Sequence, residues 1–392
     1  MITNNPIWRS KMNILDKLSE FKEQNITELH ELLKSLVAIP APSHHEEKRA
    51  EFCKAWFEAQ GAEGVYIDEA LNCVYPINCE GNNDIVVFMA HTDTVFPDTV
   101  GFEVKSDGKY FYAPGVGDDT ACLTVMMMVT KFILENKLAP KKGILIVANA
   151  CEEGLGNLKG TKQLLKDYEG RITEFYTFDG KYGGVCCECV GSHRYEVECI
   201  TEGGHSYGAF GKPNAIIELS KLITELAKVE IPVKDGIKTT YNVGLIEGGT
   251  SVNTIAQSAK MLYEYRSNDA ESLEYMKNFF DKTVAAGNER DGVEFKVNVV
   301  GIRPCGGEVD KEKLEKMITR VIEICERNTG IPCARGKGST DCNAPMSVGI
   351  PAICPGLYWG GGAHTREEWV EIASLPIGVM ICGEIMLDFF EI

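Results

Sequence analysis

Apolar residues along the chain follow two spacings, one typical of helices and one typical of buried strands. Helical spacing predicts helices over residues 27–38 and 46–60, and Pro40 and Pro42 break the chain between them. Short continuous apolar runs predict strands at 85–90, 144–150, 175–178 and 351–354. Because such strands suit a sheet that helices cover on both faces, the pattern predicts an α/β fold with a doubly wound sheet.

Side chains that can bind a metal follow these predicted strands. His91 comes directly after the first strand and Asp179 directly after the third. Glu152 and Glu153 follow the second strand, and His364 follows the fourth beyond a glycine-rich loop. In doubly wound sheets ligands bind beyond the carboxyl ends of the strands, so these groups stand where such a fold has its site.

Asp118 adds a further carboxylate, in a glycine-rich turn that precedes a long apolar helix. By itself it is explained as an N-cap or first-turn acid. His91 alone is explained as an ordinary hydrogen-bonded histidine, and the Glu152–Glu153 pair as part of a solvated loop. Two histidines and four carboxylates at strand or helix ends together favour a metal site over these separate explanations.

Composition places the chain among ordinary globular proteins. A chain of 392 residues is too long for one ordinary hydrophobic core, so two domains are expected. A composition of 44% hydrophobic and 25% charged residues is typical of a globular protein. The N-terminal sequence lacks the features of a secretory signal, and no apolar run reaches the roughly 20 residues that span a bilayer. Fifteen cysteines indicate reduced thiols, so a cytoplasmic location is expected.

Charge restricts the partners. The formal net charge is -17, which would repel nucleic acid and anionic membranes, so neither is expected as a partner. The net charge says little about a small-molecule substrate.

Six ordered segments resemble signatures of the M20 aminoacylase and peptidase family, over a stretch from about residue 30 to the C-terminus. They are MAHTDTVFPD, GVGDDTA, CEEGLGNLKG, GGHSYGAFGKPNA, VGLIEGGTSVNTIAQSA and GGGAHTREEWV. The resemblance implies a catalytic domain with a zinc-peptidase-like, doubly wound mixed sheet. An inserted α+β domain for lid function and dimerisation is implied as well.

The inserted domain is predicted over residues 193–302, which leaves 1–192 and 303–392 as a discontinuous catalytic domain. Strand-like alternation marks both ends of the insert, in RYEVECI and EFKVNVV, and a helix is predicted near 213–228. The family likeness implies that this insert forms a homodimer.

The resemblance also implies two divalent metal ions, zinc in the first instance, with manganese or cobalt as alternatives. His91 and Asp179 would hold one ion, Glu153 and His364 the other, and Asp118 would bridge both. Three protein ligands per ion leave room for water and substrate, which is typical of a catalytic site. The family also has a cis peptide bond at the position of Asp118 and Asp119.

Three residues match catalytic positions of the family. Glu152 is predicted to act as general base and then as general acid. Asp93 would orient the ring of the ligand His91. His205 would stabilise the oxyanion from the other subunit of the dimer, with a buried structural histidine as the alternative.

Substrate contacts are implied for Arg266 and Asn253, which match positions that hold the substrate backbone or carboxylate. Two residues before Arg266 this chain has Glu264 where the family usually has aspartate. The loop STDCNAP at 339–345 also resembles a family segment.

The expected activity is cleavage of amide bonds in small peptides. Aspartate at position 179 resembles the branch of di- and tripeptide aminopeptidases, especially peptidase T. The alternatives are a deacylase or carboxypeptidase acting on N-acyl amino acids, and a metal-binding or dimerising protein that has lost catalysis.

Overall fold

The chain folds into two compact units in this computed structural model, which describes residues 6–154 and 156–392. One unit comprises the residues up to Glu188 together with Glu308–Ile392, and the other comprises Cys189–Gly307. The predicted boundaries at 193 and 302 fall inside two strands of the second unit, β9 (Gly191–Ile200) and β14 (Glu294–Arg303).

An eight-stranded mixed sheet, in the order β1-β2-β6-β3-β7-β16-β8-β15, forms the centre of the first unit. Its strands are β1 (Tyr66–Ile67), β2 (Cys73–Ile77), β3 (Ile85–His91), β6 (Gly143–Asn149), β7 (Ile172–Thr177), β8 (Gly184–Cys189), β15 (Ala334–Gly338) and β16 (Ala352–Pro355). Strands β6, β3, β7 and β16 run parallel, whereas β2 and β8 are antiparallel to their neighbours β6 and β16. The predicted α/β fold with a doubly wound mixed sheet is confirmed.

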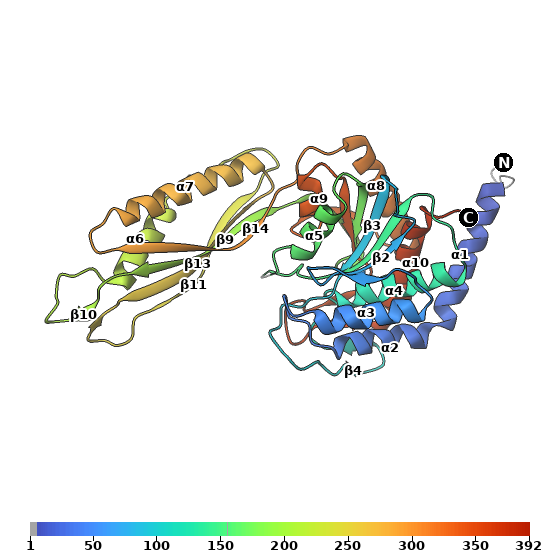
Figure 1. Cartoon of the computed structure of the whole chain (residues 1–392), viewed down its shortest axis with the longest axis horizontal. Helices are drawn as coiled ribbons and strands as arrows, with labels where there is room; N and C mark the ends of the chain where they lie inside the picture. The colour runs from blue at the N-terminus through green and yellow to red at the C-terminus, as the bar shows by residue number, and fades with distance from the viewer. Residues whose placement is uncertain (1–5, 155) are drawn as a thin grey trace. The chain divides into compact units, whose positions relative to one another are not determined.

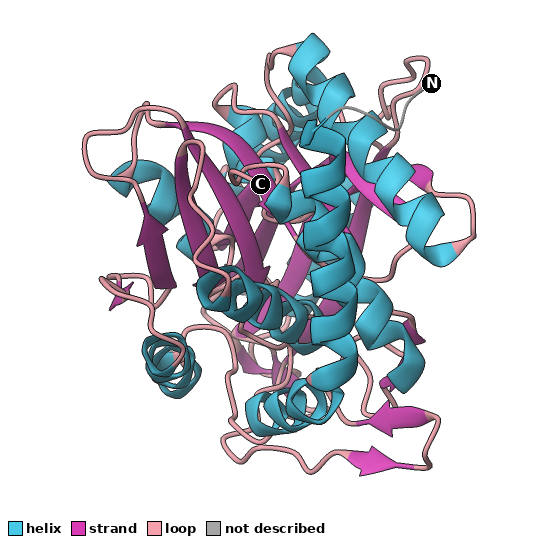
Figure 2. Cartoon of the chain, turned by 90° about the vertical axis from the view of Figure 1, so that its right-hand side faces the viewer, coloured by secondary structure: helices cyan, strands magenta, loops and turns pink. Residues whose placement is uncertain are grey.

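Helices cover this sheet, as Figure 2 shows for the cyan elements around the magenta strands. They are α1 (Pro6–Gln24), α2 (Ile26–Val37), α3 (Glu47–Ala59), α4 (Thr120–Glu135), α5 (Lys159–Asp167), α8 (Lys311–Thr329), α9 (Asn343–Ser347) and α10 (Leu375–Leu387). Every residue of β3 and β6 is buried, which explains their continuous apolar runs. Among the described residues no helix combines the length and the hydropathy needed to cross a bilayer.

A small sheet in the order β17-β18-β5-β4 completes the first unit. Its strands are β4 (Lys105–Ser106), β5 (Tyr110–Tyr112), β17 (Gly360–Gly361) and β18 (Trp369–Glu371). All fifteen cysteines of the chain are free thiols, and all except Cys186 and Cys187 are buried. Burial therefore explains most of the cysteine content without a disulfide framework.

The second unit has a four-stranded antiparallel sheet in the order β11-β13-β9-β14, with two helices packed on it (Figure 1). The remaining strands are β10 (Gly204–His205), β11 (Thr239–Gly248), β12 (Thr254–Ile255) and β13 (Ser258–Ser267), and the helices are α6 (Ala215–Leu226) and α7 (Ala270–Asn288). Asn214 caps α6 by accepting hydrogen bonds from the main-chain N–H groups of Ile216 and Ile217. This unit has its own hydrophobic core.

The pairing register between β3 and β6 determines where the candidate metal ligands lie. His91, the last residue of β3, pairs with Asn149, the last residue of β6. The chain segments that leave these two parallel strands therefore start side by side. Residues far apart in the sequence are thereby brought to one edge of the sheet.

Phe88 is fully buried in the hydrophobic core of the first unit. Its ring centroid lies 5.4 Å from that of Tyr176 and 6.3 Å from that of Phe178. We expect Phe88→Ala to lower the free energy of unfolding by about 3–5 kcal/mol, because the cavity left behind cannot fully collapse. Urea unfolding followed by circular dichroism measures this. Val100→Ala is the control, since Val100 is 76% exposed, and should change stability by no more than about 0.5 kcal/mol.

Candidate metal centre

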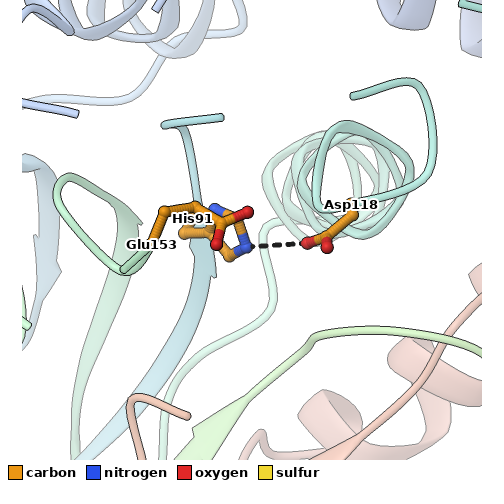
Figure 3. A group of neighbouring side chains, drawn as sticks. All are labelled: His91, Asp118 and Glu153. Carbon is orange, nitrogen blue, oxygen red and sulfur yellow. Dashed lines mark hydrogen bonds and ion pairs between the residues drawn. The ribbon is translucent and has the colours of Figure 1, made fainter. Parts of the chain in front are cut away.

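Three segments of the first unit bring His91, Asp118 and Glu153 together (Figure 3). His91 ends β3, Asp118 lies in the turn before α4, and Glu153 lies in the loop after β6. One ligand atom from each residue lies within 4.8 Å of the others. An imidazole and two carboxylates converging in this way can hold a divalent cation.

The turn before α4 requires its glycines. Gly115 has φ of +69°, and a Cβ at this position would lie 2.8 Å from Cγ2 of Thr94. A Cβ on Gly117 would lie 2.7 Å from the hydroxyl oxygen of Tyr358 and 2.8 Å from two of its ring carbons. The glycine-rich sequence therefore lets the turn pass close to neighbouring side chains and deliver Asp118 to the site.

Both carboxylate oxygens of Asp118 face a histidine. Oδ1 lies 3.2 Å from Nε2 of His91, and Oδ2 lies 3.1 Å from Nε2 of His364. The same nitrogen of His364 lies 3.3 Å from Oε1 of Glu153. The carboxylate of Asp118 therefore lies between two imidazoles.

The titration behaviour of these groups reflects a concentration of negative charge. Burial opposes protonation of His91, but hydrogen bonds to Asp118 and Asp93 hold its pKa well above the usual range. Hydrogen bonds to Asp118 and Glu153 raise the pKa of His364 to about 10. Despite burial, the hydrogen bonds from His364 and His91 hold the pKa of Asp118 well below its usual range. The carboxylates thus favour positive charge at this place, and the residues present fit a divalent cation.

Asp179 follows β7 at the same edge of the sheet. Burial and the neighbouring charge of Asp118 raise the pKa of its carboxyl well above the usual range, whereas His91 lowers it. The carboxylate of Asp179 thus interacts with both residues proposed to share its metal ion. It is not a member of the tight group of three.

Asp93 is fully buried behind His91. The Nδ1 atom of His91 lies 3.0 Å from the carbonyl oxygen of Asp93 and 3.4 Å from its Oδ1. Because a carbonyl oxygen only accepts hydrogen bonds, Nδ1 carries a proton, and Nε2 is the ring nitrogen directed at Asp118.

The carboxylate of Asp93 also fixes the loop after β6. It accepts hydrogen bonds from the main-chain N–H of Glu152 at 2.9 Å and of Glu153 at 3.0 Å. The hydroxyl of Ser43 donates a third at 2.6 Å. Asp93 therefore sets the position of the proposed base and of one proposed ligand as well as the orientation of His91.

Glu368 supports the turn of Asp118 in a corresponding way, and the sequence analysis did not single it out. Its Oε2 accepts the N–H of Gly115 at 2.7 Å, and its Oε1 accepts the N–H groups of Gly117 at 2.9 Å and Asp118 at 2.7 Å. Burial raises the pKa of Glu368 to about 7. Its only sequence signal is its place in the HTREEW segment, four residues after His364.

Two further buried carboxylates were also missed. Asp119 accepts the main-chain N–H of His91 at 3.0 Å, and the Asp118–Asp119 peptide bond is cis. Asp341, in the STDCNAP loop, accepts hydrogen bonds from Asn149 at 2.7 Å and from the hydroxyl of Thr161. Burial and the charge of Glu152 raise the pKa of Asp341 to about 7. The family likeness marked the segments that contain both aspartates, but only folding shows that their carboxylates are buried.

The second unit carries the other three predicted residues. His205 is exposed, and its Nδ1 accepts hydrogen bonds from the N–H groups of Tyr207 and Gly208, each at 3.3 Å. Asn253 is exposed and lies beside this segment, since its carbonyl oxygen accepts the N–H of Ser206 at 2.9 Å.

Arg266 lies on β13, one of the two central strands of the sheet in the second unit. Its guanidinium forms two hydrogen bonds of 3.0 Å with the carboxylate of Glu264. Strand β13 pairs in continuous register with β9, so glutamate at this position leaves the strand regular. The longer side chain reaches the guanidinium with both oxygens.

The fold and the site define a metal-dependent hydrolase. The sequence model of Peptidase family M20/M25/M40 matches residues 87–388, and the chain belongs to this family. The family resemblance seen in the motifs is thus confirmed, and so is the prediction of a hydrolytic enzyme.

Individual relatives cover nearly the whole chain. The uncharacterized protein YqjE of Bacillus subtilis is 25% identical over 87% of this chain and 92% of its own length. A tripeptidase from Staphylococcus aureus superposes with a TM-score of 0.73 at 24% identity, covering 92% of this chain and 97% of that structure. The aminopeptidase PepT from Bacillus cereus gives a TM-score of 0.67 at 22% identity, covering 92% and 99%.

We expect Glu368→Gln to weaken metal binding by about 10–100-fold, as loss of a group that supports a ligand commonly does. The amide nitrogen would replace one acceptor oxygen and face a main-chain N–H in the turn of Asp118. Competition with a chromophoric chelator measures the affinity. Glu367→Gln is the matched control, because Glu367 is the exposed neighbour in the same segment. Equal affinities of the two variants would contradict the role of Glu368.

Proposed function

We propose that the protein is a two-metal aminopeptidase that removes the N-terminal residue of di- and tripeptides. The observation that carries the proposal is the Asp118 carboxylate, whose oxygens face His91 at 3.2 Å and His364 at 3.1 Å. We assign His91 and Asp179 to one ion, Glu153 and His364 to the other, and Asp118 to both. Imidazole and carboxylate ligands suit zinc, with manganese and cobalt as alternatives.

The proposal that cleavage occurs at the amino-terminal end of the substrate rests on Asp179. Aspartate at this position resembles the aminopeptidase branch of the family, in which the substrate has a free amino terminus. Two proteins of similar structure, the tripeptidase from Staphylococcus aureus and the aminopeptidase PepT from Bacillus cereus, support the same choice. Acyl amino acids are the alternative substrates.

Glu152 is the proposed proton carrier. When bound, the metal ions would supply Lewis-acid activation of a water molecule and of the scissile carbonyl. Glu152 takes a proton from the attacking water and later delivers it to the departing amine nitrogen. Asp93 holds the main chain of Glu152, so the carboxylate is oriented before the substrate arrives.

Residues of the second unit complete the proposal. The exposed imidazole of His205 would donate a hydrogen bond to the oxyanion, and Asn253 and Arg266 would hold the substrate. For Arg266 to bind a substrate carboxylate, its hydrogen bonds to Glu264 would have to be exchanged. A homodimer formed through the second unit would allow His205 to act on the site of its partner.

The direct test is hydrolysis of a free tripeptide against its N-acetylated form by zinc-loaded enzyme. We expect preference for the free amine, and loss of turnover when the metal is removed by a chelator. Glu152→Gln should lower kcat by roughly 10²–10⁴-fold, because the amide cannot accept the proton.

Three outcomes are distinguishable in this test. Metal content equal to wild type in Glu152→Gln would show that the loss is catalytic. Preference for the acetylated peptide would contradict the aminopeptidase assignment and favour the deacylase alternative. Absence of turnover of either peptide would favour a protein that binds metal without catalysis.

Mixed dimers test the role of His205. Glu152→Gln and His205→Ala subunits are each expected to be nearly inactive alone. If His205 acts across the dimer, co-expressed mixed dimers recover activity, because one of their two sites then has both groups. No recovery in purified mixed dimers would place His205 outside the partner's site.

A further inference from the structure

An open cavity of about 410 Å³ lies beside the candidate metal centre within the first unit. Pro42, Val95 and Pro97 give it an apolar lining, to which Ser43, His45, Thr94 and Thr99 add polar groups. These residues belong to two loops, at 42–45 and 94–99. None of them was a candidate in the sequence analysis.

The cavity and the metal centre share a residue. Glu153 lines the cavity and also belongs to the group formed with His91 and Asp118. Thr94, on the opposite loop, directly follows Asp93, which accepts the N–H of Glu152. A peptide with its scissile bond at the centre would therefore have a neighbouring side chain within reach of the cavity.

The charges around the cavity select against ionic side chains. Its described lining holds no lysine or arginine, and His45 is the one basic residue in it. An acidic side chain would therefore lose its hydration close to a carboxylate-rich centre with a single imidazole as partner. The carboxylate in the lining is that of Glu153, which is hydrogen-bonded to His364 and proposed to hold metal. A basic side chain would have to compete with His364 and with the metal ion for the carboxylate of Glu153. An uncharged side chain is left as the best fit.

The walls of the cavity are held in place by contacts around them. Pro42 and Thr94 form a parallel β-bridge, and the N–H of Thr94 donates to the carbonyl of Ala41 at 2.9 Å. The other loop is held by Arg366, whose guanidinium forms a 2.7 Å ion pair with Asp98 and lies 4.9 Å from the ring centroid of Phe96. A cavity formed before binding needs little ordering when a ligand enters.

We propose that this cavity receives the side chain of a residue flanking the scissile amide, and that it selects uncharged aliphatic side chains. The inference rests on the proposed function and narrows its substrates to peptides with leucine-like residues at that position.

Two tripeptide series test the proposal, X-Gly-Gly and Gly-X-Gly, with leucine, glycine, aspartate or lysine as X. In one series we expect kcat/KM for leucine to exceed the values for the other three residues by about 10–100-fold, in line with the gain from filling an apolar pocket. Hydrolysis with equal kcat/KM for all four residues in both series overturns the cavity assignment alone, as does preference for aspartate or lysine. Absence of hydrolysis in both series overturns the proposed function and this inference with it.

Variants at Val95, which is 39% exposed, connect the preference to the cavity. Val95→Trp should lower the ratio of kcat/KM for leucine to that for glycine, because the indole fills the space. Val95→Asp should increase hydrolysis of the lysine peptide relative to the leucine peptide, a gain that misfolding cannot produce. Val100→Trp is the control, since Val100 is 76% exposed and does not line the cavity. Unchanged ratios in both Val95 variants overturn the proposal.

Discussion

Hydrogen bonds from main-chain N–H groups to buried carboxylates hold the candidate metal centre together. Asp93 holds the loop of Glu152 and Glu153, and Glu368 holds the turn of Asp118. Burying a carboxylate is costly unless several donors or a cation compensate, and each of these two accepts three hydrogen bonds. The remaining negative charge makes the centre selective for a cation.

Because Asp93 and Glu368 bind main-chain N–H groups, the positions of the candidate ligands depend on the backbone as well as on the ligand side chains. Asp118, Glu153 and His364 come from loops, which without such contacts would move independently. The same support reaches the proposed substrate cavity, because Ser43 and Thr94 flank the Asp93 interactions. Metal binding, proton transfer and side-chain selection would therefore respond together to changes at Asp93.

Much of the fold and of the centre could be predicted because each signal was local. The strands predicted at 85–90 and 144–150 correspond to β3 and β6, since buried parallel strands give continuous apolar runs. His91 and Glu153 were identifiable because metal ligands follow such strands at the edge of the sheet. Glu368 and Asp341 escaped prediction because their partners, Gly115 and Asn149, lie far away in the sequence.

The sequence by itself determined the α/β class, the family and the residues available to bind metal, because apolar periodicity and motif order are encoded locally. Tertiary structure decided which acids become supports, since burial and hydrogen-bond partners depend on segments that meet only after folding. It also decided that Glu264 pairs with Arg266 and that Glu153 lines a cavity together with Pro42, Val95 and Pro97. Both features arise from the spatial arrangement of side chains, which no single segment specifies.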